Sequence, residues 1–255
     1  MPASDDLLFP KGSIIRRVDG EGILLLGGGR ALLLQVAHPS VAAGVAEHSD
    51  FTYDPLKRLQ RTLEVTSSIV FGTVENAERE AAALRAVHDR VTGPGYQAND
   101  PELLLWVHAT LVDTALRVHD RFLRRLTDAE RADYYAQSAE VAEILGVPRS
   151  AQPPTLRTFR SYVRSTIADL RVTDHGRAVA RDVLHPRAPL LAEPLLEVYR
   201  QVTVGLLPAP LRAQYGLSWD PARGAALDVA ARASRVLLRR VPRSIRRAPI
   251  PALAG

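Results

Sequence analysis

The stretch from Asp100 to His119 most constrains how this chain can fold, because it has the pattern of one long amphipathic helix. Asp100 can cap the first free backbone N–H groups, and Pro101 fits the first helical position. Apolar residues then recur at helical spacing, and His108 lies in the middle of their face. A neutral imidazole there must satisfy two ring nitrogens, either with hydrogen-bond partners or with a metal ion.

Caps and prolines divide the rest of the chain into further helices. Thr127 and Glu130 form a capping box, and Asp220 followed by Pro221 opens a last helix. We find no strand alternation and no repeat. The expected helices cover about residues 22–37 or 30–37, 40–48, 55–71, 73–91, 100–126, 127–146, 155–170, 174–185, 189–206 and 220–240, after an irregular arm at 1–22. The sequence therefore predicts a single all-α domain over residues 1–241 and a loose basic tail at 242–255.

Composition excludes several classes of site. The chain has 255 residues, 46% of them apolar, which is enough for one sizeable core. It has no cysteine, so disulfides, thiolate-bound zinc, iron–sulfur clusters and covalently attached haem are excluded. No signal-peptide pattern and no apolar run of about 20 residues is present, which favours a cytoplasmic location.

The positive charge belongs to the C-terminal tail. The formal net charge is +5, but residues 232–255 hold seven arginines and no acid. The rest of the chain has 26 basic and 28 acidic residues, which argues against a nucleic-acid-binding domain. Apolar residues beside the arginines fit peripheral association with an anionic membrane surface. A solvated basic C-terminus is the plain alternative.

Arg58, Arg61 and Thr62 form a second group of candidate site residues. They stand at positions i, i+3 and i+4, so they share one face of the helix expected at 55–71. The residues that follow are mostly apolar or small, which predicts that this helix is largely buried. Two buried guanidinium groups need anionic partners. The alternatives are structural salt bridges to nearby carboxylates, or a pocket for a carboxylate or a developing oxyanion.

A run of three glycines, Gly27 to Gly29, precedes the helix that ends before Pro39. Glycines before a helix can hold phosphate, but the Gly-Lys-Ser/Thr ending of a phosphate loop is missing here. The small residues at 42–44 allow the close approach of another helix or of a flat ligand.

Several of these strings resemble one known family. They are Gly27–Ser49, Arg58-x-x-Arg61-Thr62, Asp100–Thr110 and the pair Tyr134-Tyr135. In this order they look like the bacterial MpaB-like or rubber-oxygenase catalytic domain, formerly a domain of unknown function. The resemblance covers about residues 14–240.

The resemblance implies a globin-like, all-α fold that binds b-type haem noncovalently. It implies that His108 is the axial iron ligand, and that His38, Arg58 and Arg61 contact the cofactor. It also places Arg58, Arg61 and Thr62 in a distal catalytic pocket. Latex-clearing members have a lysine where this chain has Arg61; because arginine stays protonated, an open or water-bound sixth iron position is expected.

The function that follows is a haem b-dependent oxidoreductase of oxygenase type. It would act on an apolar or unsaturated organic substrate with dioxygen or peroxide. One alternative is a non-catalytic helical module that binds haem or lipid. Another is a metal-dependent phosphohydrolase, built on the pairs His88-Asp89 and His119-Asp120.

Overall fold

The computed structural model describes residues 6–48, 55–186 and 189–247, without the side chains of residues 55–60, 63 and 190. Within these ranges the chain is a single all-α domain with 13 α-helices, and the structure as a whole is 75% helical. The predicted fold class is therefore confirmed. The globin-like haem core stays a prediction.

The helices follow one another along the whole chain. The α-helices are α1 (Ile14–Asp19), α2 (Gly28–Gln35), α3 (Pro39–His48), α4 (Pro55–Phe71), α5 (Val74–His88), α6 (Pro101–Val118), α7 (Asp128–Ile144), α8 (Leu156–Asp169), α9 (Asp174–Leu184), α10 (Glu193–Leu206), α11 (Ala209–Gln214), α12 (Pro221–Arg240) and α13 (Arg243–Arg246). Short helical turns are η2 (Gly22–Gly27), η4 (His119–Leu123), η5 (Arg149–Ala151) and η6 (Leu190–Ala192).

The predicted caps form as expected. The Asp100 side chain accepts a hydrogen bond from the Glu102 amide at 2.8 Å, and Pro101 stands in the first turn of α6. Thr127 and Glu130 make both bonds of a capping box at the start of α7. The Asp220 side chain accepts one hydrogen bond from the Arg223 amide at 2.8 Å and caps α12. These local bonds explain why helix starts can be read from sequence.

The structure differs from the sequence prediction at several places. Residues 22–35 form η2 followed by α2, where one helix from Gly22 or Arg30 to Ala37 was expected, and the helix expected at 100–126 ends as the π-helical turn η4. The arm expected to be irregular contains α1, and two short helices, α11 and α13, were not predicted. Residues 92–97 form a small antiparallel hairpin of β1 (Thr92–Gly93) and β2 (Tyr96–Gln97), whose turn uses Gly95 at φ 79°.

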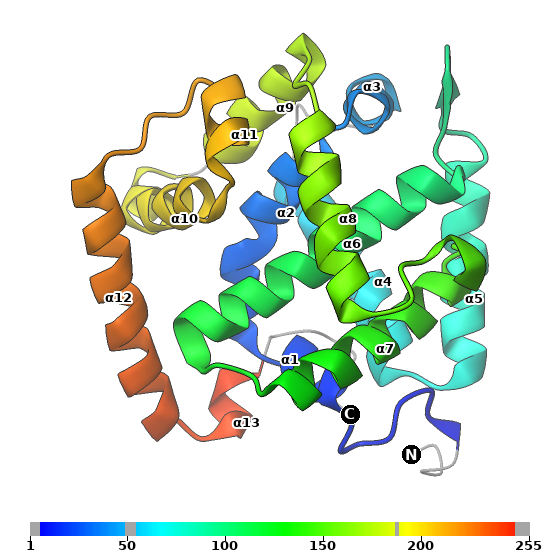
Figure 1. Ribbon diagram of the computed structural model, residues 1–255, viewed down its shortest axis with the longest axis horizontal. Coiled ribbons are helices and arrows are strands. Elements are labelled where there is room, and N and C mark those ends of the chain that lie inside the picture. The colour runs from blue at the N-terminus through cyan, green and yellow to red at the C-terminus, as the bar shows by residue number, and fades with distance from the viewer. Residues whose placement is uncertain (1–5, 49–54, 187–188, 248–255) are drawn as a thin grey trace.

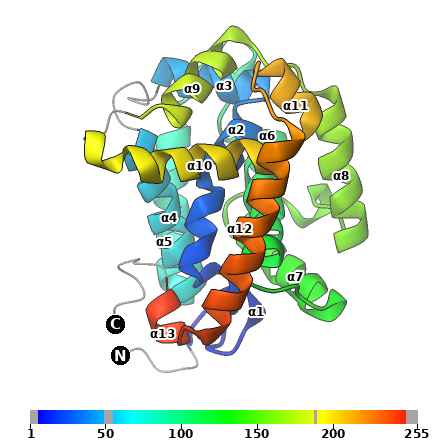
Figure 2. The ribbon, with the colours of Figure 1, turned by 90° about the vertical axis from the view of Figure 1, so that its left-hand side faces the viewer.

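Helix α6 occupies the centre of the molecule. It packs against α2, α7 and α8, while α4 pairs with α5 and α10 pairs with α12 (Figures 1 and 2). Trp106 of α6 is fully buried, and its indole N–H donates to the Leu34 carbonyl at 3.1 Å. The other helices therefore enclose the one that carries His108.

The glycine run has a packing role at the joint of η2 and α2. A Cβ atom on Gly27 would lie 2.5 Å from Cγ2 of Thr114 on α6. A Cβ on Gly29 would collide with Thr203 and Tyr199 of α10. The run thus lets α2 lie directly against two helices, and we do not assign it to phosphate binding.

The first part of the predicted tail folds back onto the N-terminal region. Helix α13 lies beside α1 in both views (Figures 1 and 2), and Arg246 Nη2 is 3.2 Å from Glu21 Oε1. Residues 248–255 lie outside the described residues. Among the described helices, none combines the length and the apolar character that a membrane crossing requires.

Candidate functional site

A mostly apolar cavity lies between α6, α7, α4, α1 and the η2–α2 joint. Its walls enclose about 1120 Å³ of empty space, part of which is open to solvent. A cavity with a few polar groups in an apolar lining is typical of small-molecule and cofactor sites. His108 and Thr62 both line this cavity, so the structure brings together two of the predicted site residues.

His108 projects from the middle of α6. It retains some accessible surface because it lines the cavity, although it lies deep in the protein. Burial lowers the pKa of His108 to about 4, although a hydrogen bond to the Ser138 backbone raises it in part. Its Nε2 atom is buried and has no hydrogen-bond partner among the described residues. The ring is therefore neutral near pH 7, with one nitrogen unused.

Two more elements add polar groups to the cavity wall. Helix α4 contributes Thr62, Thr66 and Ser67, and the Thr66 hydroxyl donates to the Thr62 carbonyl at 2.8 Å. Helix α2 contributes Gln35, whose amide donates to the Thr110 hydroxyl at 3.2 Å. These hydroxyl and amide groups can orient a ligand in a wall that is otherwise apolar.

The other predicted site residues are placed differently. Arg61 is exposed on α4 and is not among the residues that line the cavity. Successive helical residues point about 100° apart, so an inward Thr62 turns Arg61 away. The Arg58 side chain lies outside the described residues. The expectation that both arginines are buried therefore does not hold for Arg61, and their contact with a cofactor stays a prediction.

His38 lies outside the cavity, between α2 and α3. Burial lowers the pKa of His38, and the charges of Asp100 and Glu102 oppose this shift. Because these two residues begin α6, His38 lies near the start of that helix. His108 is eight residues further along α6 than Asp100, or about 12 Å by the helical rise. Contact between His38 and a cofactor in this cavity stays a prediction.

The cavity also contains an acidic residue that no sequence pattern predicted. Asp19, at the end of α1, lines the cavity opposite Tyr134 of α7, whose hydroxyl donates to Asp19 Oδ1 at 2.8 Å. Burial raises the pKa of Asp19 to about 7, although the Tyr134 bond lowers it. A buried carboxyl that titrates near neutral pH is typical of functional sites. The pair Tyr134-Tyr135 was a signal, but nothing in the sequence linked it to Asp19.

A buried ionic network supports the cavity from the other side of α6. Arg30 is 0% exposed; its guanidinium donates to Asp113 at 2.6 Å and to the Leu206 carbonyl at 2.9 Å. Burial raises the pKa of Asp113, but Arg30 and Arg117 outweigh this and hold it below its usual value. The network is saturated with partners, which indicates a structural role.

The histidine–aspartate pairs of the hydrolase alternative do not converge. Buried His119 bonds through Nδ1 to the Arg124 carbonyl at 3.0 Å, and Asp120 pairs with Arg131 at 2.7 Å. Among the residues that the structure describes, no group of three or more histidine and acidic side chains is arranged to hold a metal ion. The geometry therefore gives this alternative no support.

Comparison with known proteins agrees with the motifs. The family described as "ER-bound oxygenase mpaB/B'/Rubber oxygenase, catalytic domain" matches residues 15–236. Uncharacterised proteins of Mycobacterium bovis (Mb2261) and Mycobacterium tuberculosis (Rv2237) are each 27% identical over 205 residues, which is 75% of this chain and 80% of theirs. No solved structure matches the chain. The chain therefore belongs to the family of mpaB and rubber-oxygenase catalytic domains.

Proposed function

We propose that this protein is a haem-dependent oxygenase in which His108 holds the iron. Membership of the family supports oxygenase-type chemistry. One observation carries the haem assignment: a neutral imidazole lines an apolar cavity, and its buried Nε2 has no hydrogen-bond partner among the described residues. Leaving such a nitrogen unbonded costs about 1–3 kcal/mol, which a metal ligand would recover. Haem needs only one protein nitrogen, and a lone histidine supplies it.

The residues around His108 fit this role. The hydrogen bond to the Ser138 backbone holds the ring in one orientation, as supporting groups do for metal-ligating histidines. Burial keeps the ring unprotonated at neutral pH, as metal ligation requires. The haem, when bound, would supply the activation of dioxygen or peroxide.

The remaining walls would bind and orient the substrate. Thr62 can provide a hydrogen bond on the α4 side, and the apolar lining would exclude water and admit an apolar or unsaturated substrate. Arg58 and Arg61 stand within about one turn of Thr62 on α4, where we propose that they act as basic residues beside the site. The reaction class is oxidative attack on a C=C or C–H bond.

The test is a haem titration followed by absorption spectroscopy. We expect the wild-type protein to bind haem with a Soret band characteristic of histidine ligation. The His108→Gly variant should lose that band and regain it when free imidazole is added, because imidazole can replace the missing ligand. A His175→Gly variant, altered at an exposed histidine of α9, is the control and should behave as wild type.

Two results would overturn the proposal. One is a wild-type protein that takes up no haem while its circular dichroism shows it to be folded. The other is a Soret band that is the same in His108→Gly as in wild type. A parallel His38→Ala variant tests the predicted role of His38, and loss of haem there would restore it as a cofactor contact.

A further inference from the structure

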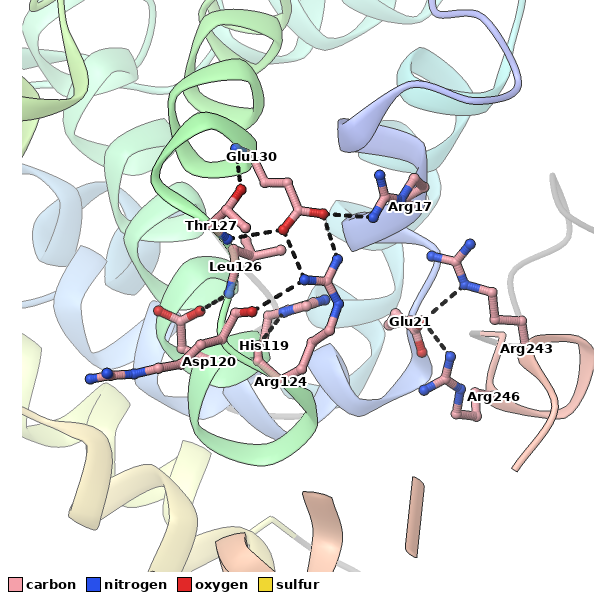
Figure 3. Close-up of polar contacts among 11 residues, drawn as sticks. Arg17, Glu21, His119, Asp120, Arg124, Leu126, Thr127, Glu130, Arg243 and Arg246 are labelled. Carbon is pink, nitrogen blue, oxygen red and sulfur yellow. Dashed lines mark hydrogen bonds and ion pairs between the residues drawn. The ribbon is translucent and has the colours of Figure 1, made fainter. Parts of the chain in front are cut away.

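A second pocket, which we call the arginine pocket, opens beside the apolar cavity. Five arginines from α1, α12, α13 and the loop after η4 line it, together with Glu21: Arg17, Arg124, Arg239, Arg243 and Arg246. It encloses about 570 Å³ of empty space, counted to its open mouth. Figure 3 shows most of these side chains converging from segments that are far apart in the sequence.

The arginine pocket has more positive than negative charge. Glu130 pairs with Arg17 at 2.8 Å and with Arg124 at 2.6 Å, and Glu21 pairs with the α13 arginines (Figure 3). Five guanidinium groups thus face two carboxylates. The nearby His119 adds no charge at neutral pH, because burial lowers its pKa to about 4. This excess favours binding of an anion.

Donors remain available for such an anion. The Nε of Arg246 is buried and has no hydrogen-bond partner among the described residues. Arg243 is only loosely held, with its Nε 3.8 Å from Glu21. Arg239 is exposed at the edge of the pocket. Planar guanidinium groups of this kind suit bidentate binding of a carboxylate.

Glu21 connects the two spaces. This residue is only 5% exposed, and it lines both the apolar cavity and the arginine pocket. Burial raises its pKa, while Arg246, Arg243 and Arg124 oppose that shift. A carboxylate therefore already stands where the apolar wall ends and the arginines begin.

We propose that the arginine pocket binds the carboxylate of a ligand whose apolar body occupies the cavity. The ligand class is an amphiphilic carboxylate. Its source is either the propionate groups of haem or the carboxylate of a long-chain substrate. Only the first source rests on the proposed function, because an apolar carboxylic acid would bind here whether or not His108 holds iron.

The experiment compares each acid with its ester. On iron-free protein, the probe is the fluorescent fatty acid cis-parinaric acid, measured against its methyl ester. In a second arm, haemin is measured against haemin dimethyl ester by absorption. We expect the wild-type protein to prefer the free acid by about tenfold or more in at least one arm, and that arm identifies the source.

Charge variants assign the preference to these arginines. Arg243→Gln/Arg246→Gln should reduce the acid-to-ester ratio toward one and leave ester binding unchanged. The control Arg232→Gln/Arg240→Gln removes the same charge from exposed positions of α12 that do not line the pocket. Should the first double variant unfold, Arg239→Gln gives the same test, because it removes a pocket charge without breaking the pairs to Glu21.

Glu21→Gln provides a test with the opposite sign. Removing the resident carboxylate should raise the ratio of acid affinity to ester affinity about threefold or more. Equal binding of acid and ester by wild type in both arms, or a preference that survives in the arginine variants, would overturn the proposal. His108→Gly should leave the fatty-acid ratio intact, so failure of haem ligation and failure of this inference are distinguishable.

Discussion

Helix α6 carries two kinds of buried polar group, and they are treated in opposite ways. Asp113 and Thr114 meet Arg30 of α2, and each polar group there has a close partner. His108 lies five residues before Asp113, about 140° around the helix, and its Nε2 has none among the described residues. A buried polar group with a complete set of hydrogen-bond partners stabilises the fold. A polar group in a cavity that lacks such a partner can bind a ligand.

Burying a polar group costs hydration free energy both in the Arg30 network and at His108. The Arg30 pair loses hydration when it is buried, and only its complete set of partners compensates for that loss. The His108 ring loses hydration without full compensation, which lowers the stability of the folded protein. The comparison therefore predicts that mutations on the two sides of α6 have different consequences for stability.

The largest effect is expected on the saturated side. Asp113→Ala would leave the Arg30 guanidinium buried without its carboxylate, and we expect it to lower the free energy of unfolding by about 3–5 kcal/mol. Arg117→Ala is the matched control. Arg117 is the other partner of Asp113, and the Arg117 side chain is 54% exposed. That variant should cost less than about 1 kcal/mol in urea denaturation. A small effect of Asp113→Ala would show that the Arg30 network does not stabilise the fold more than its exposed partner does.

The close contact between α2 and α6 gives the second prediction. Gly27→Ala places a methyl group 2.5 Å from Thr114 Cγ2, and we expect a loss of about 1–3 kcal/mol in the free energy of unfolding. Gly12→Ala is the control, because a Cβ there meets no atom within 4 Å. Equal thermal stability of the two variants would show that the joint can move apart without cost.

Asp19, which lines the same cavity as His108, should make the free energy of unfolding depend on pH. Its folded-state pKa is about 7, above its ordinary value, so between about pH 4 and pH 7 the folded protein holds a proton that the unfolded chain releases. Asp19 therefore makes the protein less stable as the pH rises through that range. Asp19→Asn removes this dependence and keeps an acceptor for Tyr134.

The measurement is urea denaturation of both proteins at pH 5 and pH 7.5. Between pH 5 and pH 7.5 the free energy of unfolding of wild type should fall by about 2–3 kcal/mol relative to that of Asp19→Asn. Asp133→Asn, at an exposed position of α7, should show no such change. A constant difference between Asp19→Asn and wild type would mean that the Asp19 carboxyl ionises normally.

The smallest effect is expected at His108. His108→Leu removes a buried nitrogen that has no partner among the described residues, and it also removes the hydrogen bond to the Ser138 backbone. Because these two effects oppose each other, the haem-free protein should keep its stability within about 1 kcal/mol. His119→Leu is the contrasting variant, because it removes a bond to the Arg124 carbonyl and should cost about 1–3 kcal/mol. If His108→Leu destabilised the protein as much as His119→Leu, His108 would be an ordinary core histidine.

Part of the candidate site could be predicted from sequence. The 3.6-residue period placed His108 on the apolar face of α6, and the cap at Asp100 and Pro101 set where that helix begins. The spacing on α4 brought Thr62 to the right helix but did not show which of its faces is buried. The exposed Arg61 illustrates this limit, because helical spacing does not show where neighbouring helices lie.

The all-α class and most helix boundaries follow from the sequence alone, because caps and periodicity act over a few residues. Only the tertiary structure decided that Asp19 meets Tyr134, and that Glu21 stands between the cavity and the arginine pocket. These contacts join segments more than 100 residues apart. They depend on how whole helices pack, which no local pattern records.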